Sequence, residues 1–248
     1  MENKKIYFAS DFHLGIPNKT ESQEREKLIV LWLDTIKNDA DSIYLLGDIF
    51  DFWFEYKKVI PKGFVRFLGK ISELIDNGIK IYFFTGNHDM WMEEYFNEEI
   101  GVIVHKKNQI ISHQNKQLFI GHGDGIDKTD YSYKLLNIIF KSKICKWLFS
   151  RLHPNFAFKI AQAWSRKSRG KIYNDTDINN GIEKLIEYCK KRQSIKAVDY
   201  YIFGHQHHPI KRNINQRCLY VNTGDWILHK TYAVLEDGLL ELKTFKAE

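Results

Sequence analysis

Cysteine and proline are scarce in this chain of 248 residues, which has three cysteines and four prolines. Cys145, Cys189 and Cys218 lie far apart and form no CxxC pair, so neither a disulfide framework nor a cysteine-bound structural zinc is expected. No apolar run reaches 18 residues, and the N-terminal stretch lacks the apolar core of a secretory signal. We therefore expect a reduced protein of the cytoplasm.

Acidic residues are missing from one segment of the chain. Between Tyr131 and Asn174 there are ten lysines and arginines and no aspartate or glutamate. The rest of the chain holds 27 basic and 31 acidic residues, so the balance there is negative. The net charge of +6 therefore arises from this basic segment, residues 131–174.

Short apolar runs alternate with helix-like stretches along the chain. Strands are expected at 6–9, 43–46, 79–84, 117–121, 200–203, 219–221, 231–235 and 239–245, and helices at 21–37 and 63–77. Residues 131–192 have a helical pattern throughout, with a break at Pro154. This order predicts an α/β fold with a largely parallel sheet core. We expect a single domain over 1–248, with a helical cap inserted at about 130–195.

Side chains that can bind a metal ion follow five of the apolar strands directly. Open α/β sheets place their sites outside the carboxyl ends of the strands, so these side chains are expected to converge. Five of the ten histidines fall in such positions. The five clusters are Asp11 with His13, Asp48 with Asp51, Asn87 with His88 and Asp89, His122 with Asp124, and His205 with His207.

The ligand types narrow the choice of metal. Histidine, aspartate and asparagine together suit Mn, Fe or Zn, whereas an all-oxygen set would favour Mg or Ca. Any one of these histidines could instead be a hydrogen-bonded loop residue, and Asp51, Asp89 and Asp124 could be turn or helix-cap carboxylates. The recurrence at five strand ends favours a shared metal site.

The same residues, in this order, resemble the calcineurin-like metallophosphoesterases. The blocks Asp-x-His, Gly-Asp-x-x-Asp, Gly-Asn-His-Asp, Gly-His-Gly-Asp and Gly-His-x-His run from Asp11 to His207. The resemblance implies a four-layer αββα sandwich around two divalent ions, which we expect to be Mn²⁺. It implies one metal at Asp11, His13, Asp48 and His207, and a second at Asp48, Asn87, His122 and His205, with Asp48 bridging.

The resemblance also implies catalytic roles. Asp48, with two oxygens, can bridge two ions that hold a hydroxide and clamp the phosphoryl oxygens. His88 is similar to the family's residue that stabilises or protonates the leaving group. Asp51, Asp89 and Asp124 are expected to lie behind the ligands, where carboxylates fix the imidazole tautomers.

Beyond the metal motifs, the chain resembles the UDP-2,3-diacylglucosamine diphosphatases of the lipid A pathway. The features that carry this resemblance are Asp130 and Tyr133 after Gly-His-Gly-Asp, the apolar stretch 147–156, the stretch from Trp164 through Ser165 to Arg169, and Gly-His-Gln-His-His-Pro at 204–209. The reaction implied is hydrolysis of the substrate's pyrophosphate to UMP and 2,3-diacylglucosamine 1-phosphate (lipid X). The substrate contacts implied are Asn87, His88, Asp130, Tyr133, Ser165, Arg169 and His205. The better-known members carry Arg where this chain has His88.

The composition of the insertion suits a lipid-linked UDP-sugar. From Lys134 to Leu152, eleven of nineteen residues are apolar. Such a cap would line a slot for acyl chains, while its lysines and arginines meet phosphates or an anionic membrane surface. We therefore expect peripheral association with the cytoplasmic side of the inner membrane. The plainer interpretation is a set of helices with solvated basic faces.

Three other functions compete with this one. The metal site could act on a soluble nucleotide or phosphodiester, which predicts a small or polar cap cavity. A DNA-processing nuclease would use the basic segment as a phosphate groove and lose affinity steeply with salt. A noncatalytic scaffold is the remaining class, although every ligand position is filled here. The apolar, aromatic insertion fits nucleic acid poorly, so we expect neither a nucleic-acid partner nor an obligate protein partner.

Overall fold

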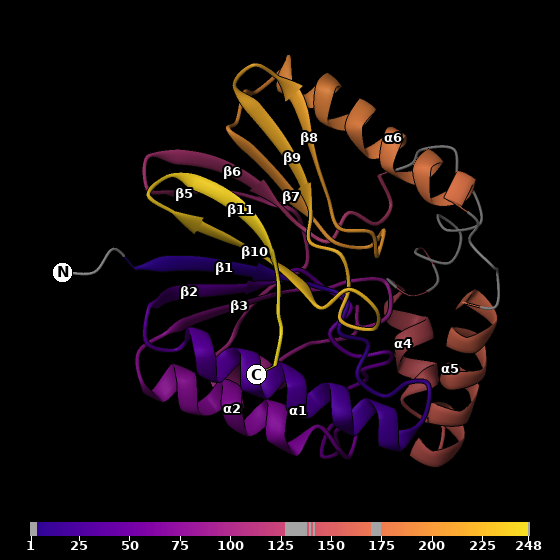
Figure 1. Cartoon of the computed structure of the whole chain (residues 1–248). Coiled ribbons are helices and arrows are strands. Elements are labelled where there is room, and N and C mark those ends of the chain that lie inside the picture. The colour runs from indigo at the N-terminus through magenta and orange to yellow at the C-terminus, as the bar shows by residue number, and fades with distance from the viewer. Residues whose placement is uncertain (1–3, 127–137, 139, 141, 170–174, 248) are drawn as a thin grey trace.

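The computed structural model describes residues 4–126, 138, 140, 142–169 and 175–247, and two β-sheets form its centre (Figure 1). The first sheet has the order β11 (Leu239–Thr244), β10 (Thr231–Glu236), β1 (Lys5–Ala9), β2 (Ala40–Leu45), β3 (Lys80–Phe84), β4 (Ile103–His105). The second has the order β5 (Gln109–His113), β6 (Lys116–Ile120), β7 (Tyr200–Phe203), β9 (Cys218–Asn222), β8 (Ile210–Asn215).

Both sheets have a parallel core, with antiparallel strands at one margin of the first sheet and at both margins of the second. Strands β1 to β4 pair in parallel, and β10 and β11 extend that sheet antiparallel. In the second sheet β6, β7 and β9 are parallel, with β5 and β8 antiparallel at the edges. The parallel core predicted from the sequence is confirmed.

The helices begin and end where local chemistry allows it. They are α1 (Lys19–Ile36), α2 (Val65–Asp76), a π-helical turn η1 (Phe96–Ile100), α4 (Lys143–Phe149), α5 (Pro154–Arg169) and α6 (Asp175–Gln193). Asn18 caps α1 by accepting a hydrogen bond from the backbone N–H of Glu21. Pro154 breaks the helical pattern as expected, because it is the first residue of α5, where its missing N–H has no helical partner to lose.

Alternating side chains on the strands separate three apolar cores, and these define four layers. On β1, Tyr7 packs toward α1 and α2, whereas Phe8 packs into the space between the two sheets. On β7, Ile202 faces that same central space, and Tyr201 packs with residues of α6. The order is therefore helices, sheet, sheet, helix, and the predicted αββα sandwich is confirmed.

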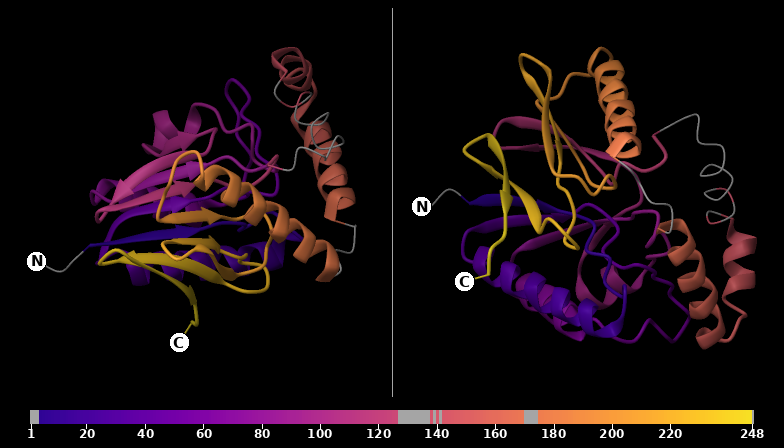
Figure 2. Two further views of the ribbon diagram at one scale, coloured as in Figure 1. Left: turned by 90° about the horizontal axis from the view of Figure 1, so that it is seen from above. Right: turned by 45° about the vertical axis from the view of Figure 1, so that its right-hand side comes forward.

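Helix α6 belongs to this sandwich. Ile182, Leu185 and Ile186 of α6 are buried with the outer face of the second sheet. Helices α4 and α5 instead stand at one end of both sheets (Figure 2). In the described part of the region 130–195, α6 therefore forms an outer layer on a sheet, whereas α4 and α5 form a separate group at the end of the sheets.

Several elements were not predicted, and their composition explains why. Strands β4, β5 and β8 lie at sheet edges and carry exposed or half-buried residues, such as Lys211 and Arg212 on β8. Cys189 and Cys218 are buried free thiols, whereas Cys145 is partly exposed. Among the described residues, no helix is long and apolar enough to cross a membrane.

Candidate metal centre

The loops after β1, β2, β3, β6 and β7 meet at one end of the two sheets (Figure 1). Several hydrogen bonds join the sheets there. His122, after β6, donates from Nδ1 to the carbonyl of Leu46, after β2, at 2.8 Å. The backbone N–H of His205, after β7, donates to Oδ2 of Asp11, after β1, at 2.9 Å. The predicted convergence of these clusters is thus a contact between sheets as well as within them.

The backbone of these loops takes an unusual conformation at the ligand-type residues themselves. A left-handed backbone costs a non-glycine residue about 1–2 kcal/mol, and such strain gathers where a site requires it. Glycines allow the loops to approach: a Cβ on Gly86 would lie 2.2 Å from Oδ1 of Asp48. Five ligand-type residues have positive φ: Asp11 (55°), His13 (43°), Asp48 (52°), His205 (69°) and His207 (56°).

One group of potential ligands contains Asp11, His13, Asp48 and His207, whose ligand atoms all lie within 4.8 Å of one another. The Nε2 atoms of His13 and His207 are 3.1 Å apart. Nε2 of His207 lies 3.3 Å from Oδ1 of Asp11, and Nε2 of His13 lies 3.7 Å from Oδ2 of Asp48. Three of the four side chains are buried, so the group is screened from water.

A second group contains Asp48, His122 and His205. Nε2 of His122 lies 3.3 Å from Oδ2 of Asp48 and 3.3 Å from Oδ1 of Asn87. Asp48 belongs to both groups. The two sets of ligands implied by the resemblance are therefore brought together, with Asp48 between them.

The residues present fit divalent cations. Oδ1 of Asp11 is buried and has no hydrogen-bond partner, and an unpaired buried carboxylate oxygen is costly. Nδ1 of His122 is engaged by Leu46 and Nδ1 of His207 by Asp225, so in both rings Nε2 is the nitrogen that faces the other ligands. A set of imidazole and carboxylate ligands without cysteine suits Mn, Fe or Zn.

The charge states of these side chains also favour the binding of a metal ion. Burial would raise the pKa of Asp11, but the imidazoles of His207 and His13 outweigh it and hold that pKa at about 2. The pKa of Asp48 lies well below its usual range, because His122 and His88 outweigh burial. Burial and the neighbouring His122 lower the pKa of His205 to about 4. Ionised carboxylates and a neutral imidazole are the forms that bind a metal.

His122 is the exception among these ligands. Burial would lower its pKa, but the Asp48 carboxylate outweighs burial and raises the pKa well above its usual value. A proton and a cation therefore compete for the point between Nε2 of His122 and Oδ2 of Asp48.

The three carboxylates predicted behind the ligands differ in what they contact. Oδ1 of Asp51 lies 3.7 Å from Nδ1 of both His13 and His88. Asp89 instead accepts hydrogen bonds from the backbone N–H groups of Gly86, Ile49 and Phe50, so it ties two loops together. The negative charge of Asp124 favours the protonated forms of His122 and His205.

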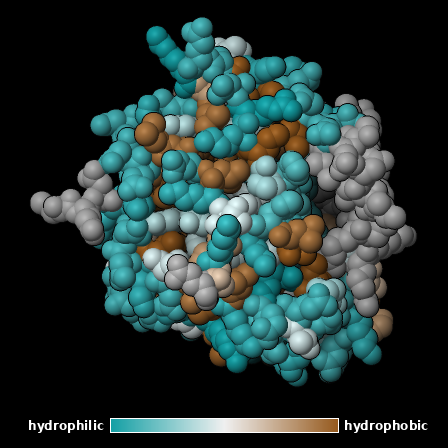
Figure 3. Space-filling model, in the orientation of Figure 1, coloured by the Kyte–Doolittle hydropathy of each residue, from teal (hydrophilic) through white to brown (hydrophobic). Residues whose placement is uncertain are grey.

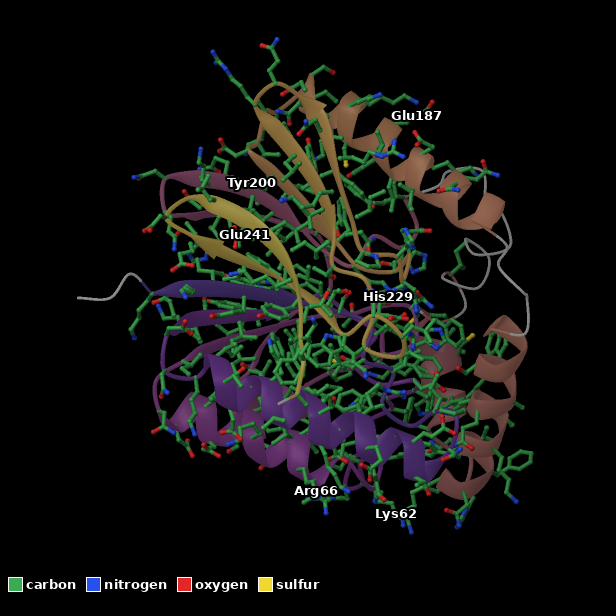
Figure 4. The ribbon with its side chains drawn as sticks, viewed as in Figure 1. Lys62, Arg66, Glu187, Tyr200, His229 and Glu241 are labelled. Atoms are coloured by element: carbon green, nitrogen blue, oxygen red, sulfur yellow. The ribbon has the colours of Figure 1, made fainter. Side chains whose placement is uncertain are left out.

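Sequence reasoning missed several residues at this end of the molecule. Oδ2 of Asp225 lies 3.3 Å from Nδ1 of His207. Asp225 follows β9 in a Gly-Asp pair, the same pattern that marks Asp48 after β2. Arg25 of α1 donates a hydrogen bond to the carbonyl of His13 at 2.8 Å. His229, labelled in Figure 4, is in the loop after β9, and its ring centroid lies 5.9 Å from that of His208.

The predicted substrate contacts are only partly described. Asp130 and Tyr133 lie outside the described residues. Arg169 ends α5, and its side chain is not among those described. Ser165 is 8% exposed, and its hydroxyl faces Asp51 and His88 rather than open solvent.

We expect chelator-treated protein to bind two equivalents of Mn²⁺ in isothermal titration calorimetry. His207→Ala and His122→Ala each remove one equivalent, because these histidines lie in different groups. Asp48→Ala weakens both, since its carboxylate is shared. Asp76→Ala, at an exposed carboxylate on α2, is the control and retains both equivalents. One equivalent in the wild type, or equal profiles for all four variants, would contradict the two-group arrangement.

Comparison with known proteins identifies the family to which the chain belongs. The sequence model of the calcineurin-like phosphoesterase family matches residues 4–209 of this chain. A UDP-2,3-diacylglucosamine hydrolase of Porphyromonas gingivalis is 36% identical over 258 residues, 98% of each chain. One of Histophilus somni is 29% identical over 242 residues, 94% of this chain and 96% of that protein. The chain therefore belongs to the calcineurin-like phosphoesterase family.

Proposed function

We propose that this protein hydrolyses the pyrophosphate of UDP-2,3-diacylglucosamine, giving UMP and 2,3-diacylglucosamine 1-phosphate in lipid A biosynthesis. The observation that carries the proposal is the 36% identity to a UDP-2,3-diacylglucosamine hydrolase over 98% of both chains. Similarity over the full length includes the region between β6 and β7, in which the metal motifs reach no further than Asp124.

The metal centre supports this reaction class. We propose that the ions are Mn²⁺ and that Asp48 bridges them. When bound, two divalent ions supply an activated water and neutralise the phosphoryl oxygens. The proposed ligands are Asp11, His13, Asp48 and His207 for one ion, and Asp48, Asn87, His122 and His205 for the other.

The chain's own residues hold this centre in place and define where substrate would lie. The backbone N–H of His88 donates to Oδ1 of Asp48 at 2.9 Å, which fixes the loop that carries Asn87 and His88 against the shared carboxylate. We propose that the side chain of His88 acts on the leaving group. We propose further substrate contacts for Asn87, Asp130, Tyr133, Arg169 and His205.

Helices α4 and α5 form the cap in this proposal. Ile144, Trp147 and Leu148 on α4 are each more than half exposed, as is Phe156 on α5. The guanidinium of Arg151 lies 4.9 Å from the centre of the Trp147 ring. Apolar side chains beside cations are typical of a surface that meets acyl chains and anionic headgroups.

The face in Figure 3 is largely hydrophilic, with brown patches over the upper strands and beside the grey residues. We propose that the cap binds the acyl chains of the substrate and attaches the protein peripherally to the cytoplasmic side of the inner membrane. Anionic lipid attracts each basic residue near the surface by about 1 kcal/mol.

Phosphorus NMR tests the reaction. Mn²⁺-loaded protein, freed of Mn²⁺ before recording, is expected to convert UDP-2,3-diacylglucosamine to UMP and lipid X. Asp48→Ala is expected to lose on the order of 10³-fold in rate, because the ions contribute several kcal/mol of charge stabilisation. Asp76→Ala is the matched carboxylate control and keeps the wild-type rate. Turnover of bis-p-nitrophenyl phosphate without turnover of the lipid would keep the phosphoesterase and reject the lipid substrate.

Sedimentation with vesicles tests whether the apolar and basic surface of α4 and α5 binds membranes. The protein is expected to bind phosphatidylglycerol vesicles more tightly than phosphatidylcholine vesicles. The double variant Ile144→Ser, Trp147→Ser is expected to bind about tenfold or more weakly, because each buried apolar side chain contributes roughly 1.5–3 kcal/mol. Ile195→Ser is the control, since Ile195 is 84% exposed beyond α6. Equal losses of vesicle binding in the double variant and in Ile195→Ser would reject the proposal that this surface binds membranes. So would the absence of a preference for the anionic vesicles.

A further inference from the structure

Ser165 of α5 is a cap side chain that makes hydrogen bonds to residues of the site. Its hydroxyl lies 3.0 Å from Oδ1 and 2.9 Å from Oδ2 of Asp51, and 3.3 Å from Nδ1 of His88. Ser165 is far from both partners in sequence, by 114 and 77 residues. Because the residue is only 8% exposed, these contacts compete little with water.

The serine fills a gap between Asp51 and His88. Nδ1 of His88 is 3.7 Å from Oδ1 of Asp51, which is too long for a direct hydrogen bond. The Ser165 hydroxyl can donate to the Asp51 carboxylate and accept from the Nδ1–H of His88 at the same time. The backbone carbonyl of Asp51, 3.1 Å from the same nitrogen, shares that N–H. Both acceptors favour the tautomer with its proton on Nδ1.

Aromatic contacts hold α5 in the position that this chain of hydrogen bonds needs. Phe158 of α5 packs on Phe52, which directly follows Asp51, with ring centroids 5.3 Å apart. Trp164, next to Ser165, packs on Phe140 at 4.7 Å. Phe140 packs on Trp91 at 5.0 Å and accepts a hydrogen bond from its Nε1. Thus the helix is docked on the two loops that carry Asp51 and His88.

We propose that Ser165 is a positioning residue for His88, rather than the substrate contact that the resemblance implied. It holds the His88 ring through Nδ1 and couples that ring to Asp51, which leaves Nε2 as the ring nitrogen available to substrate. Consequently α5 contributes to the chemical step as well as to the shape of the cap. The proposal rests on the phosphoesterase function proposed above for this site.

Steady-state kinetics separate positioning from substrate binding. Ser165→Ala is expected to lower kcat by about 10–100-fold, the usual cost of losing a partner that orients a functional group, with KM changed less than twofold. In the His88→Ala background the same substitution is expected to add no further loss, since the residues act as one unit. Ser165→Thr retains the hydroxyl and is expected to restore kcat. Ser150→Ala is the control, because the Ser150 hydroxyl bonds only its own helix, at the carbonyl of Trp147.

The rates are measured with both UDP-2,3-diacylglucosamine and bis-p-nitrophenyl phosphate. If the lipid is not a substrate, the second compound still reads the effect on His88, so failure of the substrate assignment is distinguished from failure of this proposal. A raised KM with unchanged kcat, or a loss that adds to that of His88→Ala, would overturn the positioning role.

Imidazole NMR gives a readout that does not depend on turnover. Long-range ¹H–¹⁵N spectra of the Zn²⁺-loaded protein, with His88 assigned from His88→Ala, report which ring nitrogen carries the proton. We expect the Nδ1–H form in the wild type and in Ser165→Thr, and a mixture of tautomers or a broadened signal in Ser165→Ala. An unchanged His88 signal in Ser165→Ala would overturn the proposal.

Discussion

Negative charge buried between the two sheets is the constraint on which the site depends. Asp11 and Asp48 are almost fully buried, and each ionised carboxylate loses several kcal/mol of hydration there. Their compensation comes from imidazoles and, when bound, from divalent ions. The ligand groups, the left-handed loop residues and the bonds between the sheets all follow from placing positive charge around these two carboxylates.

Much of this arrangement could be predicted from the sequence, because its signals are local. An apolar strand followed directly by glycine and a ligand-type residue predicts both the strand and the place of its side chain, as at Asp48 and His122. Edge strand β8 carries Lys211 and Arg212 on exposed positions, so it has no buried face to mark it. Asp225 carried the same Gly-Asp signal after β9 and could have been found.

Long-range contacts between side chains could not be predicted in this way. Nothing near Ser165 in the sequence indicates that its hydroxyl reaches Asp51, because the contact depends on how α5 packs against Phe52 and Phe140. The same reason explains the division of the helical region. Apolar periodicity alone does not distinguish α6, which covers a sheet, from α4 and α5, which stand over the ligand loops. Within the described residues, α5 reaches the ligand loops through the contacts of Ser165 with Asp51 and His88.

The central claim is that Asp48 joins two ligand groups into one dinuclear centre. Electron paramagnetic resonance of the protein with two equivalents of Mn²⁺ tests it most directly, because ions that share a carboxylate about 3.5–4 Å apart are magnetically coupled. We predict a coupled spectrum in the wild type that is lost in Asp48→Ala. A spectrum of isolated Mn²⁺ in the fully loaded wild type would contradict the account.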